Sequence, residues 1–260
     1  MPVVFGLLAA LLIGSSDFLG ARTAGRTTAL QTTTAAFIGG AIAVAIYSPL
    51  LGTPTTHDLW LGYARSSIGV AAPVAAVVTP VLPVLYEAAR GNAPGWLGWS
   101  GVAVGVSALI LTSWNPRRFG GNGDVGLGVA LGALAGVAFA AMFLIAIATS
   151  EESGTWPVAS QRLTAFVVAV AFGLATGRRP VADLASVRWS VLAGVLGASG
   201  VAATVYGGQR GPVAPVIVAG SMYPAVAVGL AWIFLHQQLT TRQIVGLIAA
   251  LVGVALVALD

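Results

Sequence analysis

The chain has no cysteine, no lysine and few charged residues of any kind. Without cysteine it forms no disulfide and offers no thiolate as a nucleophile or metal ligand. A Walker A loop needs a lysine, so ATP hydrolysis by that motif is excluded. The twelve basic residues are all arginines, spread thinly over the connections, and they form no patch for nucleic acid. Charged residues make up 8% of the chain, far below the roughly 25% of a soluble domain.

Hydrophobic residues supply 57% of the 260 residues, and the mean hydropathy is +0.92. A helix that crosses a bilayer needs roughly 20 mostly apolar residues. The windows are apolar all round and do not alternate, so helices fit them and a β-barrel does not. The sequence therefore predicts an all-α, polytopic membrane helix bundle. Its nine windows are 3–20, 29–51, 68–86, 95–114, 125–148, 157–176, 189–208, 213–235 and 242–259.

The first window is expected to be a span and not a signal peptide. No arginine or lysine precedes it, and it ends in Ser15-Ser16-Asp17-Phe18 instead of a cleavage site.

Two halves of the chain repeat the same small-residue markers in the same order, as in many secondary transporters built from inverted repeats. Early in each half the matched markers lie 122 residues apart, and late in each half they lie 142 apart. The early pairs are Gly6 with Gly128, Leu12 with Leu134 and Gly14 with Gly136, and the late pairs are Gly69 with Gly211 and Pro73 with Pro215. The added 20 residues equal one membrane-spanning helix.

The extra residues of the second half fall between two aromatic markers. Trp60 and Tyr63 are three residues apart, whereas their counterparts Trp189 and Tyr206 are seventeen apart. The stretch 57–66 is too short and too polar to span. We therefore expect two inverted repeats of four plus five spans, derived from a five-plus-five parent. Residues 1–120 form the first repeat, with a shortened third helix, and residues 121–260 form the second, with five regular helices.

Three stretches resemble the EamA-type permeases of the drug/metabolite transporter superfamily, and they occur in the family's order. They are Gly14-Ser-Ser-Asp-Phe-Leu-Gly20; Gly69-Val-Ala-Ala-Pro-Val74 through Gly101-Val-Ala103; and Gly211-Pro-Val-Ala-Pro-Val216 through Tyr223-Pro224 to Leu239-Thr-Thr-Arg-Gln-Ile-Val-Gly246. The resemblance implies a carrier of small molecules. The chain departs from the family where a Gly-Glu-Arg-like turn would stand, since it has Gly91-Asn92-Ala93 and His236-Gln237-Gln238 there. It also departs in the shortened third helix.

Two charged residues inside spans are the leading candidates for function, because an ionisable group in a membrane is costly and tends to mark a pathway. Asp17 is either a substrate or proton site, or an interfacial residue that is bonded to Ser15 and Ser16 or hydrated. Arg162 either binds an anionic substrate group or pairs with Asp17, or else its long side chain snorkels to the headgroups.

Polar side chains within the spans are candidates for the few polar contacts of an apolar pocket. Together with Asp17 and Arg162 they form the predicted substrate pathway. They are Ser199, Thr204, Tyr206, Ser221, Tyr223 and Trp232. Four prolines interrupt helical hydrogen bonds and are candidate kinks for gating. They are Pro73, Pro83, Pro215 and Pro224.

The sequence favours a multi-pass carrier of small organic molecules in a cell membrane, and its arginine-only composition hints at a bacterial one. Transport would proceed by alternating access, driven by a proton gradient or by solute exchange. Neither a cofactor nor a metal is expected, since His57 and His236 lie in connections without ligand-spaced partners. Two alternatives stay open, a nonfunctional or structural remnant of a carrier and a membrane enzyme acting on lipid-linked substrates.

The arginine distribution also predicts orientation, because cytoplasmic connections carry the excess of basic residues. The prediction places Asp260 outside. It places six arginines of the second half at the cytoplasmic face, namely Arg117, Arg118, Arg178, Arg179, Arg188 and Arg242.

Overall fold

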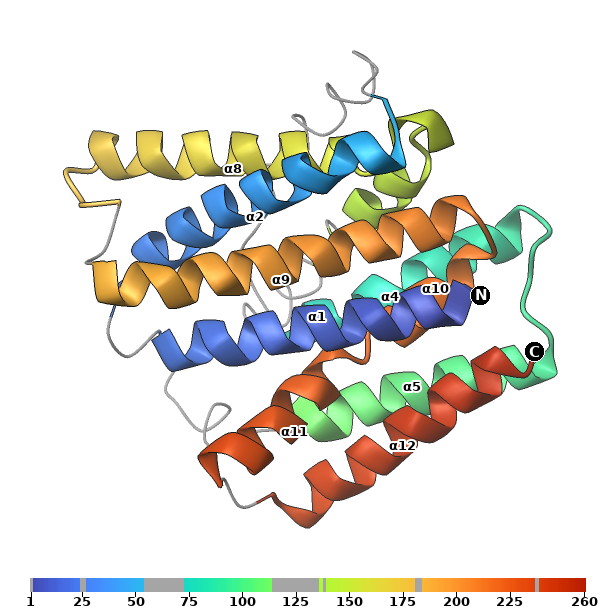
Figure 1. Ribbon diagram of the computed structural model, residues 1–260. Coiled ribbons are helices and arrows are strands. Elements are labelled where there is room, and N and C mark those ends of the chain that lie inside the picture. Colours follow the sequence, from blue (N-terminus) through green and yellow to red (C-terminus); the bar gives the residue numbers. More distant parts are fainter. Residues whose placement is uncertain are drawn as a thin grey trace.

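Each apolar window with described residues contains helix in the computed structural model (Figure 1). The structure describes residues 2–23, 27–53, 73–113, 136–137, 139–180, 184–236 and 239–260, and these contain no strand. The helices are α1 (Pro2–Thr23), α2 (Ala29–Leu51), α4 (Pro73–Ala89), α5 (Trp96–Ser113), α8 (Trp156–Ala175), α9 (Leu184–Gln209), α10 (Val213–Gly220), α11 (Tyr223–Leu235) and α12 (Thr241–Ala258). Residues 139–147 are also helical, and the short 3₁₀ turn Glu151–Ser153 precedes α8.

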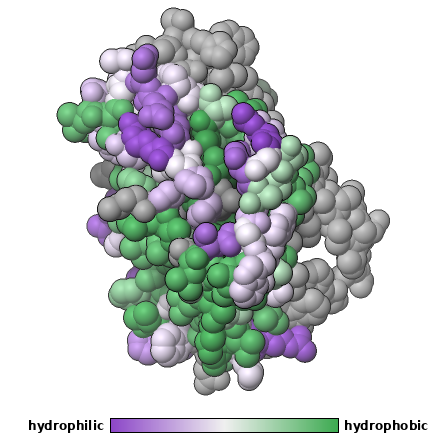
Figure 2. All heavy atoms as spheres, turned by 90° about the vertical axis from the view of Figure 1, so that its right-hand side faces the viewer, coloured by the Kyte–Doolittle hydropathy of each residue, from purple (hydrophilic) through white to green (hydrophobic). Residues whose placement is uncertain are grey.

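Five helical stretches are long and apolar enough to cross a membrane, and Thr241–Val257 is a shorter apolar helix. Large apolar side chains lie on the outside of the bundle, including Leu50 at 85% and Leu251 at 74% exposure. Such an apolar exterior is costly in water and is typical of contact with lipid. Figure 2 views the bundle end-on, from the right-hand side of Figure 1, and shows hydrophilic and hydrophobic areas side by side at that end. The predicted all-α membrane bundle is confirmed. The five stretches are Pro2–Thr23, Leu30–Leu51, Trp156–Ala175, Val187–Gln209 and Pro215–Leu235.

Helices α2 and α12 start with the same local device. Each begins after a threonine followed three residues later by a glutamine, Thr28 with Gln31 and Thr240 with Gln243. The threonine Oγ1 accepts from the glutamine backbone N–H at 3.3 Å in both helices. The glutamine Oε1 accepts from the threonine N–H, at 3.2 Å in α2 and 3.0 Å in α12. This reciprocal capping satisfies backbone donors that a helix start leaves unpaired.

Glycines set how closely the central helices approach. Gly39 and Gly40 of α2 face Val191 and Gly194 of α9 so tightly that a Cβ on any of the three glycines would meet backbone atoms of the neighbouring helix. Helices α5 and α12 cross in the same way, at Gly101 and Gly253. Small residues are the usual means by which membrane helices pack, because lipid supplies no hydrophobic drive between them.

The fourth span of the second half is broken, although the sequence predicts one regular helix there. Helix α10 ends at Gly220, and α11 begins at Tyr223 after a two-residue turn. The Ile217 carbonyl near the end of α10 accepts from both the N–H and the Oγ of Ser221, at 2.8 and 2.7 Å. Pro224 lies in the first turn of α11, where its missing N–H costs nothing. The shortened third helix expected at 57–66 lies outside the described residues, so the four-plus-five plan stays a prediction.

Both termini lie at the same end of the bundle (Figure 1). Gly211 packs on Pro2 there, and the Gly95 N–H donates to the Asp260 carboxylate at 2.7 Å. Among the described residues, this end carries four carboxylates and two arginines, while the opposite end carries five arginines. The termini end has Glu87, Glu151, Glu152, Asp260, Arg90 and Arg210, and the opposite end has Arg22, Arg178, Arg179, Arg188 and Arg242. Arg117 and Arg118 lie outside the described residues.

This charge difference leads us to expect the five-arginine end in the cytoplasm and Asp260 outside. A periplasmic phosphatase fused after Asp260 should be active, and a green fluorescent protein fused there should be dark. The reverse pattern would show that the termini face the cytoplasm and that the arginine asymmetry does not orient this chain.

Candidate functional site

Arg162 points into the bundle from the buried side of α8. Val158, Ala159 and Ala165 lie four residues before, three before and three after it, and all three are buried. Its guanidinium carbon lies 6.0 Å from the centre of the Phe37 ring of α2. The Arg162 Nε is buried and has no hydrogen-bond partner among the described residues. This arginine therefore lies within the protein and not along the lipid-facing side of its helix.

Two hydroxyl groups accompany Arg162. The Tyr47 hydroxyl of α2 donates to Ser199 Oγ of α9 at 3.4 Å, and Tyr47 lies within electrostatic reach of the arginine. We call Phe37, Tyr47, Arg162 and Ser199 the Arg162 cluster. Three helices contribute to it. The sequence pointed to Arg162 and Ser199 but missed Phe37 and Tyr47, although Tyr47 follows the apolar run 41–46 and was a visible polar exception.

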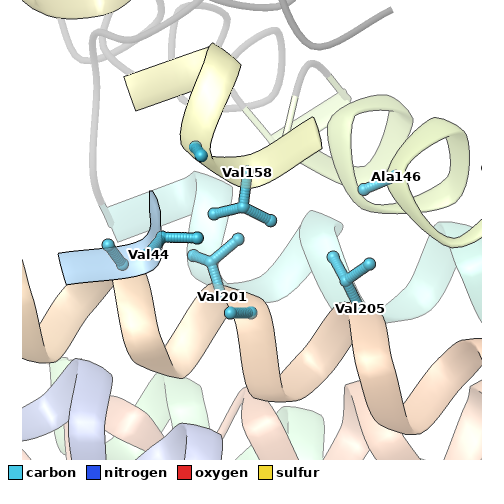
Figure 3. Packing of buried hydrophobic residues seen from close by; sticks show 8 residues of the cluster. Val44, Ala146, Val158, Val201 and Val205 are labelled. Carbon is cyan, nitrogen blue, oxygen red and sulfur yellow. The ribbon is translucent and has the colours of Figure 1, made fainter. Parts of the chain in front are cut away.

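An apolar core packs beside the Arg162 cluster, and its valines on α8 and α9 lie on the termini side of Arg162 and Ser199. Figure 3 shows Val44, Val158, Val201 and Val205 packed together from α2, α8 and α9. Val158 lies a turn nearer to that end than Arg162, and Val205 lies six residues nearer than Ser199. Tyr47 and Trp156 pack against this core.

Hydrogen bonds also join α2, α8 and α9 at the termini end. Ser48 and Thr155, both fully buried, share a hydroxyl hydrogen bond of 2.8 Å between α2 and the start of α8. Trp156 Nε1 donates to the Gly52 carbonyl at 3.0 Å, and Gln209 Nε2 donates to Thr149 Oγ1 at 3.0 Å. These contacts lie where α2 and α9 end and where α8 begins.

We expect Ser48→Ala and Thr155→Val to lower the free energy of unfolding by about 1–3 kcal/mol each, because each leaves a buried hydroxyl unpaired. The double variant should lose less than the sum of the two, since no unpaired hydroxyl remains. Chemical unfolding of the four proteins in detergent measures this coupling. Strictly additive losses would show that the two hydroxyls do not interact.

Asp17 lies on the face of α1 that packs against α10 and α11. Gly6, Ala10 and Gly14, at 11, 7 and 3 residues before it, contact those helices. Asp17 is nonetheless an exposed residue. Tyr223 of α11 is within its electrostatic reach. Among the described residues, Asp17 forms no hydrogen bond with Ser15 or Ser16 and no ion pair with Arg162.

The other predicted pathway residues are not gathered around either charged group. Thr204 and Ser221 are buried and donate to carbonyls of their own helices, Gly200 at 3.1 Å and Ile217 at 2.7 Å. Tyr206 stacks near Phe5, with ring centroids 5.4 Å apart, and lies beneath Arg210 at the termini end. Trp232 of α11 is 55% exposed.

The four predicted kink prolines occupy different helical positions. Pro73 is the first residue of α4, and Pro83 is a buried residue within α4. Pro215 and Pro224 lie in the first turns of α10 and α11, on the two sides of the break at Ser221 and Met222. The break therefore lies between two prolines. Among the described residues, no group of histidines and carboxylates is placed to hold a metal ion.

Comparison with known proteins gives a structural neighbour and a family for this chain. One solved structure, described as "Crystal structure of protein", matches 99% of this chain and 98% of its own length with a TM-score of 0.74. At 19% identity this likeness concerns the fold alone. Comparison with curated proteins gives no match. The EamA-like transporter family matches residues 126–259, just over half of the 260. The chain is a multi-pass membrane protein of the EamA-like transporter family.

Proposed function

We propose that this protein is a secondary-active carrier that moves small organic molecules by alternating access between two helical halves. The family match carries the proposal, since the family is one of membrane transporters. The geometry supports it, because charged groups lie within the spans at two depths. Arg162 is six residues inside α8 from the termini end, and Asp17 is six residues from the end of α1 at the opposite side.

The two ends of the bundle differ in their contacts, which supports transport by alternating access. Hydrogen bonds and an apolar core hold α2, α8 and α9 together toward the termini end, while Asp17 is exposed near the other end. Alternating access needs these contacts to open while others close. The turn between α10 and α11 breaks the helical ladder beside α1 and offers a place for bending.

Energy for transport would come from a proton gradient or from exchange with another solute, because the chain has no lysine for a Walker A loop. The substrate pathway in this proposal runs past Asp17, Tyr223, Ser199 and Arg162. Membership in a transporter family fits a protein that is not an enzyme.

Flux into proteoliposomes tests the proposal. The purified protein is reconstituted and offered a panel of radiolabelled amino acids, organic acids, amines and sugars, with protein-free vesicles as the control. Saturable uptake of at least one solute is the expected result. Uptake no greater than in protein-free vesicles across the panel would favour the alternative, a remnant that no longer transports.

A further inference from the structure

We propose that the Arg162 cluster binds the carboxylate group of a small organic anion with an apolar body. This proposal rests on the function proposed above and names the class of substrate. It concerns Phe37, Tyr47, Arg162 and Ser199, which come from α2, α8 and α9.

Arg162 carries a charge that no described residue compensates. Arg162 stays protonated in proteins, and a charge within a membrane bundle is normally paired. None of the described residues forms an ion pair with Arg162, and its buried Nε has no hydrogen-bond partner among them. Asp17, the other charged residue of the predicted pathway, lies near the opposite end of the bundle. An anionic ligand would supply the missing counter-charge.

The Arg162 cluster also supplies several hydrogen-bond donors. Guanidinium groups bind carboxylates through parallel N–H donors, and hydroxyls can add further hydrogen bonds. The Tyr47 to Ser199 contact is long at 3.4 Å, so this pair gives up little when it turns toward a ligand. The hydroxyl hydrogen of Ser199 has no acceptor among the described residues. Arg162, Tyr47 and Ser199 can therefore all donate to one anionic group.

Apolar side chains surround the polar groups of the Arg162 cluster. The Phe37 ring lies beside the guanidinium, and Tyr47 contacts the valine core around Val44 and Val158. These apolar side chains suit a ligand with a hydrocarbon or aromatic body and disfavour a ligand with a second charge. A cation would be repelled by Arg162, and a neutral amide would leave the arginine uncompensated. A monocarboxylate with an apolar body fits best.

Both a solute carboxylate and a lipid phosphate could pair with an arginine. The side of α8 that carries Arg162 also carries buried Val158 and Ala165, which favours a ligand held within the protein. The experiment separates these sources by lipid composition.

Binding is measured by thermal stabilisation of the full protein in phosphatidylcholine nanodiscs. The probes are benzoate and 3-methylbutanoate, each compared with its primary amide. At least one acid should stabilise the protein saturably, and its amide should not. Arg162→Gln should weaken this binding by about 10-fold or more, the range expected when a charge-assisted hydrogen bond is lost. Arg162→Lys should recover part of the affinity, and Tyr47→Phe should lose less.

Arg90→Gln is the matched control, since Arg90 lies at the exposed end of α4 away from the cluster. It should bind the acid as the parent does. The proposal is overturned if neither acid stabilises the protein, if acid and amide act equally, or if Arg162→Gln binds as well as the parent. It is also overturned if only added phosphatidylglycerol stabilises the protein through Arg162, because the site would then be a lipid site.

Flux distinguishes this inference from the proposed function. A protein that carries neutral solutes at a rate unchanged by Arg162→Gln, and binds neither acid, retains the carrier function and refutes the carboxylate site. A protein with no flux but with Arg162-dependent acid binding retains the site and refutes the carrier.

Discussion

Gly194→Ala should destabilise the bundle by about 2 kcal/mol or more, because a Cβ at this position would overlap the Ala36 backbone of α2. The overlapping atoms include the Ala36 carbonyl oxygen and Cα, so no side-chain rotation can relieve the clash. Helices α2 and α9 would have to move apart, and the hydroxyl and apolar contacts beside them would loosen. The thermal midpoint of the purified protein in detergent measures this effect.

Gly229→Ala is the matched control. Gly229 lies inside α11, and a Cβ there would meet no atom within 4 Å. Alanine is the better helix former by about 1 kcal/mol, so this variant should be as stable as the parent or slightly more stable. Equal stability of the two variants would show that α2 and α9 do not cross as closely as the structure places them.

Asp17→Asn should reduce transport by about 10-fold or more and leave stability near that of the parent. Asp17 is an exposed residue of α1, so we expect the loss of its charge to cost little stability. An ionisable residue kept at such a place in a membrane is typical of substrate or proton pathways. Initial uptake rates in proteoliposomes, together with the thermal midpoint, separate a functional loss from a structural one.

Asp17→Glu keeps the charge and should retain part of the activity. Glu87→Gln removes a carboxylate near the end of α4, outside the proposed pathway, and should transport normally. Unchanged uptake in Asp17→Asn would exclude Asp17 from substrate binding and coupling.

The sequence predicted which segments are helices because membrane spans are specified by length and hydropathy. The predicted window 29–51 has the same limits as α2, and the window 242–259 is displaced by one residue from α12. The break between α10 and α11 was not predicted. It depends on Ser221 ending one helix and Pro224 starting the next, and prolines are common inside continuous membrane helices as well.

The candidate site was harder to predict, since side-chain partners depend on which helices pack together. Arg162 was identifiable as a charge inside a span, but Tyr47 and Phe37 became relevant only because α2 packs against α8 and α9. Apolar residues surround most of each helix, so the pattern does not tell which side faces the protein. Asp17 and Arg162 were considered as a pair, and the fold keeps them near opposite ends.

The central claim, that this chain is a carrier, is tested most directly by solute exchange. Proteoliposomes are preloaded with an unlabelled solute that passed the flux screen, and entry of the labelled solute is followed over time. For an alternating-access carrier, the labelled solute should enter preloaded vesicles faster than empty ones and should accumulate transiently above its equilibrium level. The reason is that a carrier with bound solute returns its binding site to the outer face more readily than an empty carrier does. Entry that is linear in concentration and unaffected by preloading would contradict the account.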